Sequence, residues 1–319
     1  MMSTTTISPI SRAGRVSAPS GTLRHTRQKL GSRSATVAAI VIAVIWTIPT
    51  FGLLVTSFRP ASAIMTTGWW TALIHPSFTL SNYTQTLTLN AGVKVAQALV
   101  NSLTITLPAT IIPLAVAALA AYALSWIDFK GRDFLYIGIF ALQIVPIQMV
   151  LVPLLSMYSN GVHVAGVTLF SGLASGVGNV SFARVWISHT IFAMPLAVFI
   201  LTNSMSAIPH DLIEAANMDG AGHGQIFLRV VLPLAMPAIA AQAIFQFLWV
   251  WNDLLVATIF ASGLNAPINE VLNNMQGNYN QQWYLLSAGT FIAIIVPLIV
   301  FFALQRFFVR GLLAGATKG

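Results

Sequence analysis

Long apolar segments are the feature of this sequence that most restricts its fold. Six segments of about 20 or more predominantly apolar residues alternate with short polar stretches, and about 20 such residues let a helix cross a bilayer. Only 7% of all residues are charged, whereas a soluble domain carries roughly 25%. The sequence therefore predicts an all-α membrane protein with six transmembrane helices, at about 37–58, 99–125, 134–157, 184–204, 235–260 and 285–308.

Several of these segments contain proline, which we interpret as marking kinks more often than helix ends. In a membrane bundle, neighbouring helices, side chains and water can satisfy the backbone groups that a proline leaves without a partner. The prolines concerned are Pro49, Pro108, Pro113, Pro146, Pro153, Pro195, Pro237 and Pro297.

The basic residues predict the orientation of the chain. If the amino terminus is cytoplasmic, twelve of the 15 Lys and Arg residues fall on the cytoplasmic side and three on the other side. An excess of Lys and Arg in cytoplasmic loops is typical of inner-membrane proteins. We therefore expect both termini in the cytoplasm, and external segments at about 59–97, 158–183 and 261–284.

Composition excludes several classes of protein. The chain has no cysteine, which excludes disulfides, thiolate metal sites and cysteine nucleophiles. The net charge is +8, but the basic residues lie in the amino-terminal tail and beside the apolar segments, as in an oriented membrane protein. We therefore expect no nucleic-acid partner. Residues 1–36 are basic, free of acids and rich in Ser and Thr, and predict a disordered cytoplasmic tail. An organelle transit peptide is the alternative for this segment, and a cleaved secretion signal fits less well.

The most unusual polar stretch lies between the fourth and fifth segments. It places Asp211, Glu214, Asp219 and Arg229 close together in a chain that is otherwise poor in charge. Pro209 suits a helix start, and Asp211 suits the positive end of a helix dipole. Gly readily takes the left-handed conformation that ends a helix. Residues 209–218 therefore predict a short helix that Asp219-Gly220 ends, followed by a second helical piece from about Ala221 to Pro233. We expect small residues on one side of this helical finger and acidic residues on the other.

This stretch, "EAANMDGAGHGQIFLRVVLP" from Glu214 to Pro233, resembles the EAA loop of ABC importer permeases. Val230 stands where that family usually has Ile. The resemblance implies that residues 209–233 form a coupling helix which docks on the ATP-hydrolysing subunit. Glu214 would pair there with a basic residue. The residues implied in this contact are Glu214, Ala215, Ala216, Asp219, Gly220 and Pro233.

The carboxyl terminus resembles that of the second, MalG-like permease of carbohydrate importers. In that family the tail reaches between the two ATPase subunits, which implies ATPase contacts for Arg310, Gly311, Gly315 and Lys318. Glycines would let the backbone pass through a narrow cleft. Shorter similarities extend over most of the chain after residue 40, including "TSFRP", "FTLSNY", "NSLTIT", "AAYALSWIDFKGRD" and "FLWVWNDLL". Within the family, the sequence is most similar to the α-glucoside permease subgroup represented by AglG.

The resemblance implies a type I ABC importer permease fold in a bacterial inner membrane. The implied partners are a MalF-like second permease subunit, two ATPase subunits, an extracytoplasmic solute-binding protein, the lipid bilayer and a sugar. We find no GxxxxGK[ST] phosphate loop, so we expect no cofactor on this chain and ATP with Mg on the ATPase partner. The implied division is a tail at 1–36, a first span at 37–58, an external loop at 59–96, a permease domain at 97–305 and a tail at 306–319.

Polar residues inside the predicted spans are candidates for the transport pathway or its gate. A carboxylate in a membrane span is by default a functional hypothesis. We expect Asp253 to be hydrated in a cavity or paired with Arg184, in a structural or gating role. Trp249 and Asn252 lie beside it in the sequence. Amide side chains in the spans are either sugar contacts or packing contacts between helices, and the rings of Trp249 and Trp251 could stack on a sugar ring. The amides are Gln143, Gln148, Asn203, Gln242 and Gln246. The histidines show no metal-ligand spacing, so we expect no metal site.

Two other classes stay open from sequence. An ion-coupled secondary carrier needs titratable groups along its path, for which Asp253 is the candidate. A membrane enzyme needs a cluster of acids, bases or metal ligands, and the sequence shows none. Within the importer class, another oligosaccharide or a glycerol phosphate is an alternative cargo.

Overall fold

The computed structural model describes residues 33–90, 93–165, 167–173, 180–278 and 282–316, and it divides into two units, residues 1–53 and 54–319. The described part of the first unit is most of helix α2 (Arg33–Ser57). From Thr36 to Phe51 the side chains of α2 are exposed. A helix of this length that exposes apolar side chains suits lipid rather than water. It corresponds to the first predicted span.

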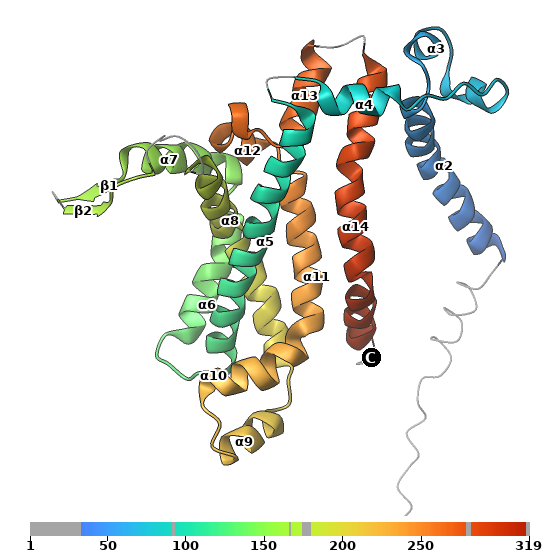
Figure 1. Ribbon diagram of the computed structural model, residues 1–319. Helices are drawn as coiled ribbons and strands as arrows, with labels where there is room; N and C mark the ends of the chain where they lie inside the picture. The colour runs from blue at the N-terminus through green and yellow to red at the C-terminus, as the bar shows by residue number, and fades with distance from the viewer. Residues whose placement is uncertain (1–32, 91–92, 166, 174–179, 279–281, 317–319) are drawn as a thin grey trace, which may run out of the picture. The chain divides into compact units, whose positions relative to one another are not determined.

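The second unit is built on four long helices that lie side by side (Figure 1). They are α5 (Val95–Trp126), α8 (Val180–Ser206), α11 (Leu232–Trp251) and α14 (Trp283–Ala316). The shorter elements are α3 (Ala61–Thr66), η1 (Trp69–Leu73), α4 (Ser81–Thr88), α6 (Arg132–Ala141), η2 (Leu142–Ile144), α7 (Ile147–Asn160), β1 (Val162–Val164), β2 (Val167–Phe170), α9 (His210–Met218), α10 (His223–Ile226), η3 (Phe227–Val231), α12 (Leu255–Phe260), η4 (Gly263–Asn265) and α13 (Ile268–Asn278).

The spans agree with the sequence in number when a bent helix pair is counted as one. Within the described residues, five helices are long and apolar enough to cross a membrane, and the pair α6–η2 and α7 brings the number to six. The predicted all-α membrane fold with six spans is confirmed in this form. A small exception is the antiparallel hairpin of β1 and β2, in which Val162 pairs with Phe170.

The third span differs from the predicted straight segment at 134–157. Its two halves, Arg132–Ile144 and Ile147–Asn160, are bent by 101° relative to each other. Pro146 lies at the bend, as the residue that precedes α7. Proline has no N–H and disfavours helical geometry in the residue before it. At this position the proline therefore marks a helix end as well as a bend.

The fifth span also differs from its predicted limits of 235–260. It runs as one helical stretch from His223 to Trp251, so it begins inside the predicted cytoplasmic finger. A turn at 252–254 then separates it from the short helix α12. Hydropathy alone did not reveal this turn, because α12 is as apolar as the span before it.

Two prolines inside α5 show how a span tolerates proline. Pro108 and Pro113 lack the N–H groups that would bond the carbonyls of Thr104 and Ala109, four residues earlier. The indole nitrogen of Trp186 on α8 donates to the Thr104 carbonyl at 2.9 Å. The amide nitrogen of Gln246 on α11 donates to the Ala109 carbonyl at 3.1 Å. Both carbonyls are thus satisfied by neighbouring helices, as expected for a membrane bundle.

Replacement of Gln246 tests this arrangement. Gln246→Leu should lower the free energy of unfolding by about 1–3 kcal/mol, because the Ala109 carbonyl loses its donor in a buried position. In a Pro113→Ala background the backbone N–H of residue 113 can donate to the Ala109 carbonyl instead. Gln246→Leu should therefore lower the free energy of unfolding less in that background. Thermal unfolding of the four proteins in detergent gives the coupling energy. An equal loss of stability in both backgrounds would contradict the role of Gln246 as the donor that replaces the missing N–H of Pro113.

Candidate functional site

The predicted cytoplasmic finger is present as two short helices with a break between them. Helix α9 follows Pro209 and ends before Asp219. Gly220 has φ +78° and nothing lies within 4 Å of where its Cβ would be. An L-residue is strained at this φ, which is why glycine suits the break. The chain continues through α10 into the fifth span (Figure 1).

Apolar and aromatic contacts hold the finger against the end of α5. Ile213 of α9 and Ile226 of α10 are buried in one cluster with Tyr122. The hydroxyl of Tyr122 lies 3.0 Å from Nδ1 of His223. The ring of Trp126 packs edge-on against His210, with 4.9 Å between ring centroids. Both halves of the finger are therefore attached to α5.

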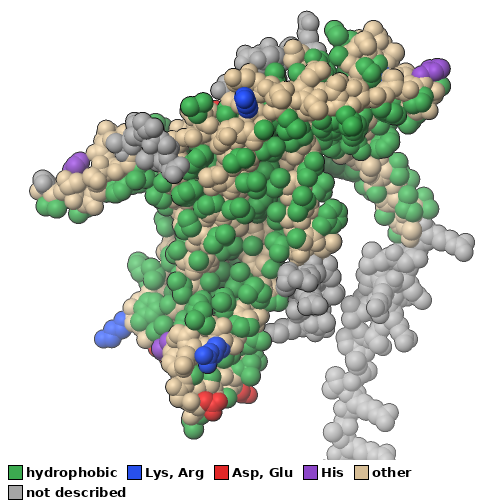
Figure 2. Space-filling view, viewed as in Figure 1, with side chains coloured by type: hydrophobic (Ala, Val, Ile, Leu, Met, Phe, Trp, Pro, Cys, Tyr) green, Lys and Arg blue, Asp and Glu red, His purple; other side chains and the backbone are tan. Residues whose placement is uncertain are grey.

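One face of α9 is exposed and acidic. Asp211, Glu214, Ala215 and Met218 follow helical spacing on one side of α9, and all four are exposed. In Figure 2 the Asp and Glu side chains gather at this end of the molecule, over α9. The Glu214 carboxylate has no bonding partner among the described residues. Glu214 therefore presents its carboxylate on an exposed face of α9.

The expected separation into a small side and an acidic side is only half right. Ala216 is half-buried and packs on the apolar cluster beneath the finger. Ala215 instead shares the exposed face with Glu214. The reason is helical spacing, because consecutive residues point in directions about 100° apart. A partner on this face would meet a carboxylate beside a small side chain.

Pro233 joins the finger to the fifth span. It occupies the first turn of α11, directly after the π-helical turn η3. A π-helical turn in an otherwise α-helical stretch commonly marks a functional position. Pro233 has no N–H to donate to the carbonyl of Arg229, four residues earlier. Arg229 lies in the π-helical turn η3, which is wider than an α-helical turn. The finger thus connects to α11 without a flexible loop.

The carboxyl-terminal residues can be followed only in part. Helix α14 continues through Arg310, Gly311 and Gly315 to Ala316. Gly311 and Gly315 thus lie in a helix, and the contact of these residues with the ATPase subunits stays a prediction. Lys318 lies outside the described residues.

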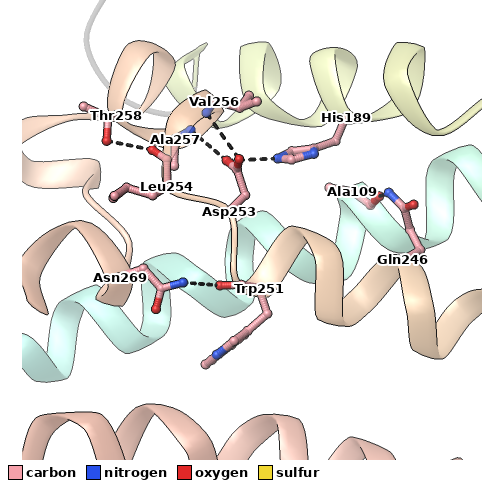
Figure 3. A network of polar contacts seen from close by, with 10 residues as sticks. All are labelled: Ala109, His189, Gln246, Trp251, Asp253, Leu254, Val256, Ala257, Thr258 and Asn269. Atoms are coloured by element: carbon pink, nitrogen blue, oxygen red, sulfur yellow. Dashed lines mark hydrogen bonds and ion pairs between the residues drawn. The ribbon is translucent and has the colours of Figure 1, made fainter. Parts of the chain in front are cut away.

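Asp253 lies in the turn after α11 and organises it (Figure 3). Its carboxylate accepts hydrogen bonds from the backbone N–H of Val256 at 3.4 Å and of Ala257 at 3.0 Å. These are bonds of the helix-capping type, at the start of α12. A carboxylate oxygen also lies 3.6 Å from Nε2 of His189 on α8. Asp253 therefore joins the turn to α12 and α8.

The predicted pair of Asp253 and Arg184 is not formed. The guanidinium of Arg184 donates instead to the carbonyl of Leu173, from Nε at 2.9 Å. The third candidate, Asn252, donates from Nδ2 to the Leu248 carbonyl of its own helix at 2.8 Å. Of the three predicted gate residues, Asp253 faces α8, Trp249 contacts His189, and Asn252 is exposed.

His189 is the residue that sequence reasoning missed. Its side chain is completely buried, and its ring meets the ring of Trp249 edge-on at 5.2 Å. Neither ring nitrogen makes a hydrogen bond among the described residues, so Asp253 is its polar neighbour. A histidine inside an apolar span was itself the signal.

A cavity of about 510 Å³ opens beside these residues, at the bend of the third span. Its walls come from the bend, from α8 around Pro195 and from α11. On α11 the lining residues follow the spacing i, i+3, i+4 and i+7, which places them on one helix face. The lining includes Gln143, Phe192, Gln242, Phe245, Gln246 and Trp249.

The segment around α13, predicted to be external, is attached to α5. Nδ2 of Asn101 donates to the carbonyls of Leu264 and Ala266, each at 3.0 Å, and the N–H of Ile268 donates to the Ser102 hydroxyl at 2.8 Å. The "NSLTIT" stretch thus holds this segment. Glu270 is buried here, and the burial raises the pKa of its carboxyl group.

Comparison with known proteins agrees with this architecture. A family model described as "Binding-protein-dependent transport system inner membrane component" matches residues 113–313. The osmoprotective compounds uptake permease protein GgtD of Synechocystis sp. is 47% identical over 288 residues, which cover 88% of this chain and 91% of that protein. The alpha-glucoside transport system permease protein AglG of Rhizobium meliloti is 46% identical over 253 residues, which cover 79% of this chain and 63% of that protein.

A solved structure shows the same fold. A chain in the crystal structure of a bacterial alginate ABC transporter, in complex with an alginate pentasaccharide-bound periplasmic protein, matches with a TM-score of 0.61 and 13% identity. The match covers 89% of this chain and 96% of that chain. Together with the family match over more than half of the sequence, these similarities agree with the described helices. The chain therefore belongs to the family of binding-protein-dependent transport system inner membrane components.

Proposed function

We propose that this chain is the permease subunit of an ATP-driven bacterial sugar importer and forms half of its translocation pore. The observation that carries the proposal is the exposed acidic face of α9, held at one end of the helix bundle by Ile213 and Ile226. A carboxylate without a partner in its own chain suits a basic residue of an ATPase subunit. Closure of the ATPase dimer would move the finger, and the finger would move the spans.

The other partners follow from the family. They are a second permease subunit, two ATPase subunits and an extracytoplasmic binding protein that meets the segment around α13. Both termini lie in the cytoplasm, on the same side as the finger. The chain itself binds no nucleotide, and ATP with Mg is used by the ATPase subunits.

The proposed cargo is an oligosaccharide, with an α-glucoside as the first choice. The name of AglG, at 46% identity, supports an α-glucoside. The name of GgtD, at 47% identity, supports an osmoprotective compound instead. A glycosylated osmolyte would reconcile the two names. A different oligosaccharide or a glycerol phosphate is the alternative.

The proposal is tested by ATP hydrolysis of the whole complex in nanodiscs. This chain, its co-expressed permease and ATPase subunits and their binding protein are assayed with maltose, trehalose, sucrose, glucosylglycerol and glycerol 3-phosphate. We expect stimulation by one or more neutral glucosides. Stimulation by glycerol 3-phosphate alone would discard the sugar assignment, and failure of any ATPase to assemble with the chain would contradict the importer.

A second function has one observation in its favour. A proton-coupled carrier needs titratable groups at depth, and His189 and Asp253 form such a pair. The variant Asp253→Asn, which keeps an oxygen but cannot carry a proton, distinguishes a proton-coupled carrier from the ATP-driven importer.

A further inference from the structure

The cavity at the bend of the third span has the size of a ligand site. Its volume of about 510 Å³ lies within the usual range for small-molecule pockets, about 300–1,000 Å³. Most of its walls are apolar, including Phe192 and Phe245. Pockets of this kind place a few polar groups on an apolar lining to orient their ligand. The polar groups here come from two walls, which are formed by the bend and by α11.

Gln242 is the polar group that the fold itself does not use. Its side chain is 4% exposed and lines the cavity. Its amide makes no hydrogen bond among the described residues. The neighbouring Gln246 is equally buried, but its nitrogen satisfies the Ala109 carbonyl. Its polar atoms are not among the described side-chain atoms that are both fully buried and without a partner, so the amide faces the open space of the cavity. A ligand in the cavity would supply the missing partner.

Two further groups face the same space. Gln143 lines the cavity from the bend, and Trp249 lines it from the end of α11. Neither side chain makes a hydrogen bond among the described residues, and the edge-on contact with His189 fixes the Trp249 ring. Amides both donate and accept hydrogen bonds, as sugar hydroxyls do. An aromatic ring can also cover the apolar face of a pyranose.

The charge of the lining selects the class of ligand. Of the described residues that line the cavity, none is charged. An anion or a cation would enter without a counter-charge, which is costly in an apolar site. A lipid acyl chain or an apolar side chain of a partner subunit would leave the amide of Gln242 without a partner. A neutral molecule with many hydroxyl groups fits both constraints.

We propose that this cavity is a glycosyl-binding subsite on this chain, where Gln242 and Gln143 bond hydroxyl groups from two walls and Trp249 covers the ring face. The inference rests on the proposed function, because it requires that the complex imports a sugar. It adds that this chain, and not its partner permease alone, recognises the cargo inside the membrane. It also makes the cargo a neutral glycoside rather than a sugar phosphate.

The test uses the complete complex in nanodiscs and the sugar that stimulates the wild-type complex most. Retention of that radiolabelled sugar is measured with a non-hydrolysable ATP analogue present, and its binding to the isolated binding protein is measured separately. Gln242→Leu and Gln143→Leu should each weaken retention by the complex about three- to tenfold. Gln148→Leu is the matched control, because Gln148 is exposed on the same bend and does not line the cavity.

The outcomes separate the subsite from the function. If the wild-type complex is stimulated by no sugar, the proposed function fails. If it is stimulated and retains sugar, but Gln242→Leu and Gln143→Leu retain it as well as Gln148→Leu does, the function stands and the subsite is wrong. Unchanged retention together with higher thermal stability in Gln242→Leu would show that lipid or the partner permease fills the cavity. If Gln242→Leu does not assemble, the exposed Gln143 decides the question alone.

Discussion

Glu214→Lys is expected to abolish sugar-stimulated ATP hydrolysis and uptake, by about 100-fold or more. The change places a positive charge opposite the basic residue that the proposed ATPase contact requires, and like charges across an interface cost several kcal/mol. Each 1.4 kcal/mol, roughly, corresponds to a factor of ten. The measurement is ATP hydrolysis and sugar uptake by the complex reconstituted with its binding protein.

The fold should not change in this variant. Glu214 is exposed, and surface substitutions usually alter stability by about 0.5 kcal/mol or less. Thermal unfolding and membrane insertion should therefore match the wild type. Asp133→Lys is the matched control, because Asp133 is exposed in the first turn of α6 and the charge change is the same. Equal loss in both variants would point to a general effect of added positive charge instead of a contact of the finger.

Asp253→Ala is expected to lower thermal stability and to impair uptake strongly. The change removes the acceptor for the N–H groups of Val256 and Ala257. Loss of a helix cap costs about 1–2 kcal/mol. It also removes the polar neighbour of the buried His189. Helix α12 should detach from its place against α8, which unfolding measurements on the purified chain and uptake by the complex would both detect.

Asp253→Asn distinguishes a structural role from proton transfer. Asparagine keeps an oxygen that can cap α12, but it cannot take up and release a proton in the working pH range. A structural or gating role predicts that Asp253→Asn retains most of the stability and uptake that Asp253→Ala loses. A proton relay predicts that both variants lose uptake while Asp253→Asn stays folded. That second outcome would favour the ion-coupled carrier.

Hydropathy and local motifs were sufficient for the number of spans and for the finger. Pro209, the helix after it and the break at Gly220 follow from the preferences of single residues, so the sequence specifies them locally. The bend at Pro146 could not be singled out, because eight prolines lie in the predicted spans. Pro108 and Pro113 differ from Pro146 because donors on α8 and α11 bond the Thr104 and Ala109 carbonyls that these two prolines leave without a partner. Those donors are distant in sequence and only the packed structure shows them.

The pathway residues show the same limit. The spacing of Gln242, Phe245, Gln246 and Trp249 places them on one face of a helix, and it could have been recognised beforehand. The sequence could not show which of the two glutamines already makes a hydrogen bond within the fold, because that depends on the position of Ala109 in another helix. The pairing of Asp253 with His189 instead of Arg184 likewise depends on how α8 packs beside the turn. Sequence identified the costly carboxylate but not its partner.

The bonds to the Thr104 and Ala109 carbonyls of α5 have a mechanical consequence. Bonds from Trp186 and Gln246 fasten α5 to α8 and to α11 at the points where α5 would otherwise bend most easily. The finger lies between α8 and α11 in the chain and is attached to α5 as well. We therefore expect a force on α9 to be distributed over these three helices and to tilt them together. The deformable seam is then the boundary with the bent third span, which is the wall of the cavity that holds Gln143.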